Sequence, residues 1–195
     1  MKTTINSASS KRRSPIGREE GRQRLINASI TLLQKTPFSQ VSVREIAKLA
    51  DVNKTFIHSW FGSQQLLYLS VAERMIGELL NKITTNDSKE VALNPFDQDV
   101  KFTVRLLFWL ELEGLDTSLL SPLMDRLLEA YTIRLVSHEG LSVTTAKDLT
   151  PQAAALGLGI ASYGKLLGME NPVNFARSLE LWRRQLDFLR EMPTD

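Results

Sequence analysis

The sequence predicts an all-α protein with about nine helices, divided into a small N-terminal three-helix domain and a larger helical body. Apolar residues recur at helical spacing through most of the chain, and no segment alternates apolar and polar residues as a strand would. Helix start signals, namely capping residues and Thr–Pro or Asn–Pro pairs, precede several of these segments. Hydrophobic residues make up 43% of the chain, which is sufficient for a packed core.

The first expected helix covers residues 18–35 and follows a basic arm. Residues 1–17 are rich in Ser, Thr, Lys and Arg without periodicity, so we expect a flexible segment there. Apolar residues between Leu25 and Leu33 then recur at helical spacing. The segment 36–39, which contains Pro37, ends this helix.

Two short helices follow, joined by a turn at residues 50–52. Ser42 and Glu45 have the spacing of a capping box, in which each side chain bonds the other residue's backbone N–H. Asn53 is the expected N-cap of the next helix, which ends at Phe61. Helices this short are not stable alone, so they must pack on the first helix.

The body is expected to contain the remaining helices. Ser63 is the expected N-cap of a helix reaching about residue 82, and Thr150–Pro151 and Asn171–Pro172 each place proline at a first helical position. We expect the later helices over 96–113, 118–137, Pro151 to Gly168, and Pro172 to just before Pro193, with loops over 84–95 and 138–149. The predicted domains are an arm over 1–17, a helix-turn-helix domain over 18–66 and a body over 67–195.

The third helix has a polar face without any acidic residue. Inward spacing falls on apolar residues such as Ile57 and Phe61, whereas the outward positions of the two short helices are cationic or hydrogen-bonding: Arg44, Lys54, Thr55, His58 and Ser59. Such a face is suited to the DNA major groove. The alternative is an ordinary helical hairpin with a solvated polar face, although such faces usually mix both charge signs.

The charge distribution also favours a nucleic-acid partner at the N-terminal end. Residues 1–70 contain 11 Lys and Arg against 4 Asp and Glu, whereas residues 71–195 contain 13 against 18. A basic front and an acidic rear indicate that only one end faces phosphate. The absence of cysteine and of any apolar run of about 18 residues predicts a soluble cytoplasmic protein that does not enter a membrane.

The segment SVREIAKLADVNKTFIHSWFGSQQLL resembles the DNA-binding domain of the TetR family of bacterial regulators, with a match over about residues 22–70. The matching residues are Ser42, Ile46, Ala47, Ala50, Val52, Ile57, Phe61, Ser63, Leu66 and Leu67. This resemblance implies a homodimer that reads a palindromic operator in double-stranded DNA, usually as a repressor, and is released by a small molecule.

Four positions depart from the family pattern. Asp51 replaces a glycine of the turn, although aspartate tolerates a left-handed backbone better than most residues. Thr55–Phe56 replaces Gly–Thr, His58 replaces a tyrosine, and Gln64 replaces a lysine that pairs with the DNA backbone. We therefore expect the class of protein to be retained and the operator to differ.

The expected DNA contacts divide into two groups. Ser42, His58 and Gln64 are expected on phosphates, and Lys54, Thr55 and Ser59 near base edges. Arg44 could reach either, and Phe56 could press on a thymine methyl group or belong to the core. The arm residues Lys11, Arg12, Arg13 and Arg18 could enter the minor groove or remain solvated.

The body is expected to hold an effector pocket and a dimer interface. Large side chains of the middle helices could line an apolar cavity for a small effector, or be ordinary core residues: Phe102, Leu106, Trp109, Met124 and Tyr131. Seam-like spacing in the last two helices predicts half of a four-helix bundle formed with a second copy: Ala153, Gly157, Ala161, Phe175, Leu179, Trp182 and Leu186. The alternative is that both helices are buried within one chain, and Leu181 and Phe188 offer a second stripe that could face such a core.

An enzyme is not expected. The chain has two histidines, no cysteine and no glycine-rich phosphate loop, and its paired acids are two residues apart, so they diverge on a helix. No metal site or cofactor is predicted. Two other hypotheses keep the DNA-binding domain: a body that binds a protein partner, and an architectural DNA binder without sequence preference.

Overall fold

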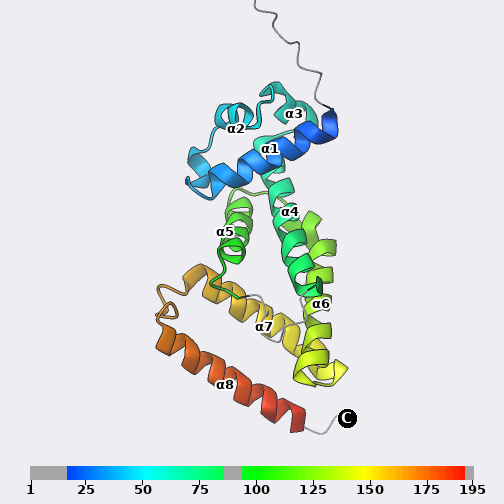
Figure 1. The fold of residues 1–195 in the computed structure, drawn as a ribbon, viewed down its shortest axis with the longest axis vertical. Helices are drawn as coiled ribbons and strands as arrows, with labels where there is room; N and C mark the ends of the chain where they lie inside the picture. Colours follow the sequence, from blue (N-terminus) through cyan, green and yellow to red (C-terminus); the bar gives the residue numbers. More distant parts are fainter. Residues whose placement is uncertain (1–16, 86–93, 192–195) are drawn as a thin grey trace, which may run out of the picture.

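The computed structural model describes residues 17–85 and 94–191, and within these ranges every regular secondary-structure element is a helix (Figure 1). This confirms the predicted fold class. The predicted arm with Lys11, Arg12 and Arg13, most of the expected loop over 84–95, and Pro193 lie outside the described residues. The elements are α1 (Arg18–Leu33), η1 (Phe38–Gln40), α2 (Val43–Ala50), α3 (Thr55–Phe61), α4 (Gln64–Thr85), α5 (Gln98–Leu112), η2 (Thr117–Leu120), α6 (Ser121–Glu139), α7 (Val143–Tyr163) and α8 (Pro172–Glu191).

Helices α1, α2 and α3 form one end of the molecule, which we call the head (Figure 1). Leu25 of α1, Ile46 of α2 and Ile57 of α3 meet in its core, and each is fully buried. Leu67 of α4 is equally buried, so α4 closes the core from the side of the body. The two short helices are thus stabilised by packing on α1 and α4, as their length requires.

Local capping determines where α2 and α4 begin. The Ser42 Oγ accepts the N–H of Glu45 at 3.2 Å, and the Glu45 carboxylate accepts the N–H of Ser42 at 2.9 Å, which completes the predicted capping box. Asp51 ends α2 with φ 54°, the left-handed conformation expected of it. Ser63 caps α4 through the N–H of Leu66 at 3.1 Å.

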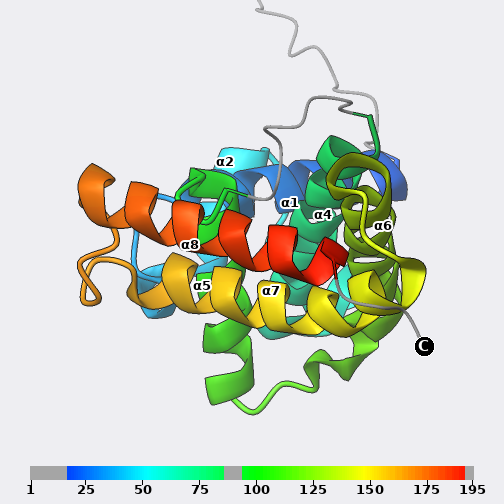
Figure 2. The same cartoon turned by 90° about the horizontal axis from the view of Figure 1, so that it is seen from below.

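The body is built around α4, which contacts α1 in the head and also packs on α5 and α6. Helix α6 packs in turn on α7. Helices α7 and α8 lie along each other at the end of the molecule farthest from the head (Figures 1 and 2). A small second apolar cluster there joins Leu186 of α8 to Leu135, Leu141 and Leu149.

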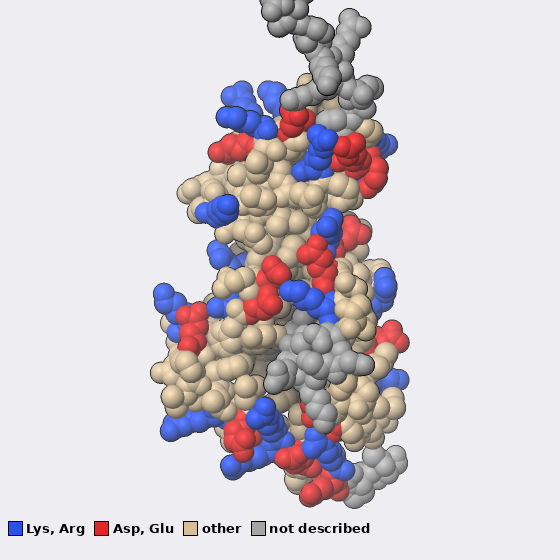
Figure 3. Space-filling model, viewed as in Figure 1, with Lys and Arg blue, Asp and Glu red and all other residues tan. Residues whose placement is uncertain are grey.

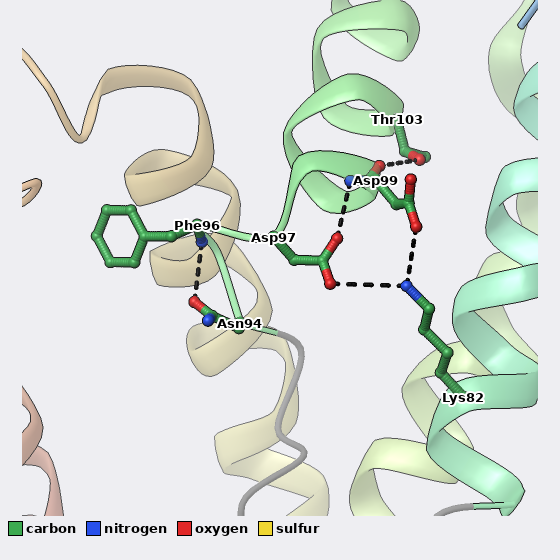
Figure 4. Close-up of polar contacts among 6 residues, drawn as sticks. All are labelled: Lys82, Asn94, Phe96, Asp97, Asp99 and Thr103. Carbon is green, nitrogen blue, oxygen red and sulfur yellow. Dashed lines mark hydrogen bonds and ion pairs between the residues drawn. The ribbon is translucent and has the colours of Figure 1, made fainter. Parts of the chain in front are cut away.

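An ion cluster connects the end of α4 to the start of α5 (Figure 4). The Lys82 ammonium lies 2.9 Å from Asp99 Oδ2 and 3.6 Å from Asp97 Oδ2. Asp97 also caps α5 by accepting the N–H of Asp99 at 2.8 Å. The hydrogen bond to Asp99, together with the nearby charge of both carboxylates, raises the pKa of Lys82. The cluster therefore positions the first turn of α5 against α4.

The predicted start of α7 is wrong. We expected a loop over 138–149 and a helix beginning at Thr150–Pro151, but α6 continues to Glu139 and α7 already begins at Val143. Gly140 adopts a left-handed conformation that ends α6, and Ser142 caps α7 through the N–H of Thr145 at 3.1 Å. Pro151 lies inside α7, where the buried face formed by Ala146 and Leu149 continues past it. Helix α7 ends at Tyr163, before the expected Gly168.

Candidate nucleic-acid interface

Helix α3 presents an exposed row of polar and aromatic side chains. Lys54, Thr55, Phe56, His58 and Ser59 are exposed, whereas the residues that alternate with them, Ile57 and Phe61, are buried in the head. None of residues 52–61 is acidic. Figure 3 shows Lys and Arg side chains at the top of the molecule, over α2 and α3, with acidic side chains beside them. The exposed face of α3 can therefore approach a polyanion without placing its own carboxylate against it.

Short-range hydrogen bonds fix both ends of α3. The Asn53 Oδ1 accepts the N–H of Thr55 at 3.0 Å and its hydroxyl at 2.9 Å. At the other end, His58 Nδ1 lies 3.2 Å from the carbonyl oxygen of Gly62, which can only accept, so Nδ1 carries the proton. The His58 side chain is exposed at this end of α3. Gly62 itself has φ 89°, a conformation that side chains other than hydrogen disfavour.

The two aromatic residues of this surface are stacked. The rings of Phe56 and Trp60 are parallel to within 4°, with their centroids 4.3 Å apart. Trp60 is half-buried against the head core, and its carbonyl accepts a hydrogen bond from the Arg22 guanidinium. That guanidinium also lies 4.2 Å from the centre of the Phe61 ring. Phe56 is thus a surface residue and does not belong to the core of the head.

Ser42 and Gln64 are both engaged within the protein. The Ser42 hydroxyl donates to the Glu45 carboxylate at 2.7 Å while it caps α2, and these bonds lower the pKa of Glu45. The Gln64 amide nitrogen donates to the Val41 carbonyl and to the Tyr68 hydroxyl, each at 2.7 Å. Because an amide has two N–H donors, neither is left for a phosphate. This position of Gln64 differs from the expected one, whereas Arg44 is exposed on α2.

Comparison with known proteins finds similarity at the level of structure. No family model and no curated protein matches the sequence. The crystal structure of the TetR family repressor AlkX from Dietzia sp. strain DQ12-45-1b, implicated in biodegradation of n-alkanes, matches 90% of this chain and 100% of its own, with a TM-score of 0.50 and 23% identity. The multidrug binding protein EbrR, complexed with imidazole, matches 93% of this chain and 98% of its own, with a TM-score of 0.53 and 19% identity.

The chain has the TetR-family fold. The resemblance seen in residues 22–70 therefore extends, as a fold, to the body.

Three of the five residues expected in an effector pocket belong instead to a packed joint between head and body. Phe38 of η1 makes edge-to-face contacts with Phe102 and Trp109, at centroid distances of 6.1 and 5.9 Å. Trp109 also lies 5.7 Å from the ring of Tyr68 in α4. Leu106, on the same helix, is fully buried in the core. Sequence reasoning missed Phe38, because a lone aromatic in a short turn carries no periodicity signal.

The other two residues, Met124 and Tyr131, line a small apolar cavity between α5, α6 and α7. Its volume is about 100 Å³, and Val100 of α5 and Gly157 of α7 complete its walls. Burial raises the pKa of the Tyr131 hydroxyl, so this group stays neutral over the physiological range. The body thus contains a cavity, and of the five predicted residues Met124 and Tyr131 line it.

Most of the residues of α7 and α8 that were expected at a dimer interface face the interior of the chain. Ala161 and Leu186, expected at the dimer interface, are 7% and 4% exposed and lie in the protein's own core. Ala153 and Gly157 line the internal cavity, Phe175 packs edge-to-face on Phe96 at 4.6 Å, and Trp182 is half-buried with Leu186. Leu181 and Phe188 are instead exposed, at 61% and 64%, and Leu179 is 38% exposed. The buried members of the α8 seam pack within the chain: Leu186 and Trp182 against Leu135 and Leu149, and Phe175 against Phe96.

Between residues 17 and 85 and between 94 and 191, the His, Asp and Glu side chains form no group of three that could hold a metal ion. Within the same ranges, no helix combines the length and the apolar character needed to cross a bilayer.

Proposed function

We propose that this protein is a transcription regulator that binds a palindromic DNA duplex as a homodimer, with α3 in the major groove. The observation that carries the proposal is the exposed, acid-free face of α3 on a rigid head. Its Lys54 ammonium has the reach and charge to contact guanine O6 and N7, and the Thr55 and Ser59 hydroxyls are placed for base edges. His58 and Arg44 flank this row and would contact phosphates.

Gln64 and Ser42 receive different roles in this proposal. Both side chains hold the structure of the head, Ser42 as the cap of α2 and Gln64 as a link between α4 and the strand-like residue before α2. They act by positioning α2 and α3, and no direct phosphate contact is assigned to the Gln64 amide. The recognition surface is therefore carried by Arg44, Lys54, Thr55, Phe56, His58 and Ser59.

The DNA-binding proposal is tested by selecting bound duplexes from random DNA. Two-fold symmetric sites, with half-site centres roughly 34–36 Å apart, are the expected result. Affinity is then measured across a salt titration for the wild type, Lys54→Ala and Lys147→Ala. Lys147 is an exposed lysine on α7 in the body, so it controls for loss of one positive charge. Lys54→Ala should weaken binding and Lys147→Ala should not; equal effects, or no retention of any duplex at low salt, would refute the proposal.

The homodimer is proposed to form through the outward faces of α7 and α8. Leu156 and Tyr163 of α7 are 53% and 54% exposed, and Val173, Leu181 and Phe188 of α8 are 57–64% exposed. Several large apolar side chains exposed on two helices at one end of a molecule are typical of an interface. A second copy is the natural occupant, because a palindromic site requires two heads related by a two-fold axis.

This interface is tested by sedimentation velocity on charged variants. Leu181→Glu and Phe188→Glu should shift the protein from dimer to monomer, because a carboxylate cannot be buried in an apolar interface without a large desolvation cost. Leu112→Glu is the matched control, since Leu112 is 83% exposed at the C-terminal end of α5, outside the proposed interface. Dimers that survive both α8 variants would place the interface elsewhere.

The cavity lined by Met124 and Tyr131 is proposed as the effector site of a repressor. Its apolar walls and its volume of about 100 Å³ suit a small, uncharged ligand, since drug-sized ligands occupy cavities of roughly 300–1,000 Å³. The structural neighbours include a repressor implicated in n-alkane degradation and a multidrug binding protein complexed with imidazole. Small apolar and heteroaromatic compounds are therefore the first to be screened.

The effector proposal is tested by thermal shift and by release from DNA. A compound that binds the folded state raises the unfolding temperature with concentration. Gly157→Leu, which fills the cavity from α7, should abolish both this shift and the release of DNA, and Leu112→Ala should preserve both. If no compound shifts the wild type, the body is better regarded as a site for a protein partner.

A further inference from the structure

The stacked aromatic pair on α3 is the least expected part of the interface. Phe56 is 41% exposed on a helix of seven residues whose other outward side chains are polar or cationic. Its ring is stacked on the ring of Trp60, and the residue remains accessible to solvent. An apolar ring therefore occupies the centre of a surface that is otherwise built for hydrogen bonds.

The pair is held rigidly before any ligand arrives. Trp60 is anchored against the head core, and Arg22 bonds its carbonyl. Parallel stacking then fixes the ring of Phe56 on the indole, and Asn53 holds the first turn of α3. A side chain that is already ordered loses little conformational entropy when it binds, so its contact contributes nearly in full.

Only one apolar group is displayed by base pairs in the major groove, the C5-methyl group of thymine. We propose that Phe56, backed by Trp60, is a specificity-determining residue that recognises a C5-methylated pyrimidine in each half-site. Thymine satisfies this requirement, and so does 5-methylcytosine. The proposal rests on the proposed function, because it requires α3 to lie in the major groove. It implies that methylation of a cytosine at that position strengthens binding.

The experiment uses the full chain and the duplex selected from random DNA. Each thymine of the duplex is replaced in turn by deoxyuridine, which removes the methyl group and leaves the hydrogen-bonding pattern unchanged. Burial of one methyl group corresponds to about a fourfold change in affinity. At one thymine position in each half-site we expect this loss, and about fifteenfold when both half-sites are changed together. With cytosine at that position, 5-methylation should raise the affinity about fourfold.

Two variants assign the effect to Phe56. Phe56→Ala should bind thymine and uracil duplexes equally well at that position, whereas Leu112→Ala should keep the wild-type ratio. Leu112→Ala truncates an exposed apolar side chain of the body, outside the recognition surface. Thermal unfolding of each variant verifies that the head is folded, and Phe56→Leu provides an apolar replacement that should keep part of the methyl dependence.

The outcomes separate this inference from the function on which it rests. Failure of the wild type to retain any duplex would refute both. Specific DNA binding without sensitivity to uracil at any thymine, or with the same sensitivity in Phe56→Ala, would leave the regulator proposal intact and overturn the role of Phe56. A loss of affinity in Phe56→Ala that is equal on every duplex would also overturn it, since that pattern indicates a wedge or packing role.

Discussion

Truncation of the Gln64 side chain distinguishes its two possible roles, a structural residue of the head and a phosphate contact. Gln64→Ala removes two hydrogen bonds of 2.7 Å, one to the Val41 carbonyl and one to the Tyr68 hydroxyl. Each such bond contributes roughly 0.5–1.5 kcal/mol, so the variant should lose about 2 kcal/mol of unfolding free energy. For a chain of 195 residues this corresponds to a fall in Tm of roughly 4–8 °C.

The matched control is Gln65→Ala, which changes the same residue type one position later. Gln65 is exposed and should tolerate truncation within about 0.5 kcal/mol. Unfolding is followed by far-ultraviolet circular dichroism in urea and on heating, and DNA affinity is measured well below the transition. If Gln64→Ala leaves the unfolding free energy unchanged and lowers affinity for DNA, the inward hydrogen bonds are unimportant and the phosphate contact expected from the sequence is correct.

Three other predictions concern α7, α2 and the joint. Pro151→Ala should raise the unfolding free energy by about 1–3 kcal/mol, because it restores an N–H for the Lys147 carbonyl and removes a ring clash inside α7. An unchanged or lower Tm would contradict this. Hydrogen bonds from Ser42 lower the pKa of Glu45 in the folded state, so their stabilisation is present above the unfolded pKa and is lost as pH falls through the folded value. Ser42→Ala should therefore flatten the acid side of the stability profile, and an unaltered profile would contradict this. Phe38→Ala should lower the unfolding free energy by about 2–3 kcal/mol, because it removes two edge-to-face contacts and part of the packing between head and body. Separate unfolding transitions of the head and the body would be the clearest sign of this loss. An unchanged Tm would argue against a packed joint.

The head could be predicted from sequence because its rules are local. The capping box of Ser42, the left-handed turn at Asp51 and the cap at Ser63 each depend on residues within four positions of one another. The two short helices left few ways to bury Ile57, so the outward face of α3 followed from spacing alone. These expectations agree with the structure.

The body was harder because competing signals had similar strength. Thr150–Pro151 is a good start signal, but Ser142 is another, and the buried positions of Ala146 and Leu149 decided between them. Helix α8 carries two apolar stripes, and sequence spacing could not tell which one would meet the apolar cluster around Leu135 and Leu141.

The aromatic residues of α5 illustrate the same limit. Phe102 and Trp109 fit either a cavity wall or a packed contact. Their packed position depends on Phe38, which lies far earlier in the chain, in η1. Contacts between residues so far apart leave no periodic trace. For Gln64, the amide could point outward or inward, and the carbonyl of Val41 determined the direction.

Helix α4 runs from the head into the body, so a change in its tilt would move the head. Its 22 residues form one continuous rod of about 33 Å, with the head attached along one end and Lys82 pinned near the other. A tilt of only about 6° about the pinned end would displace the far tip by roughly 3.4 Å, which is the rise of one base pair. In the proposed homodimer on DNA, a tilt of this size would therefore change the separation of the two heads by about the rise of one base pair.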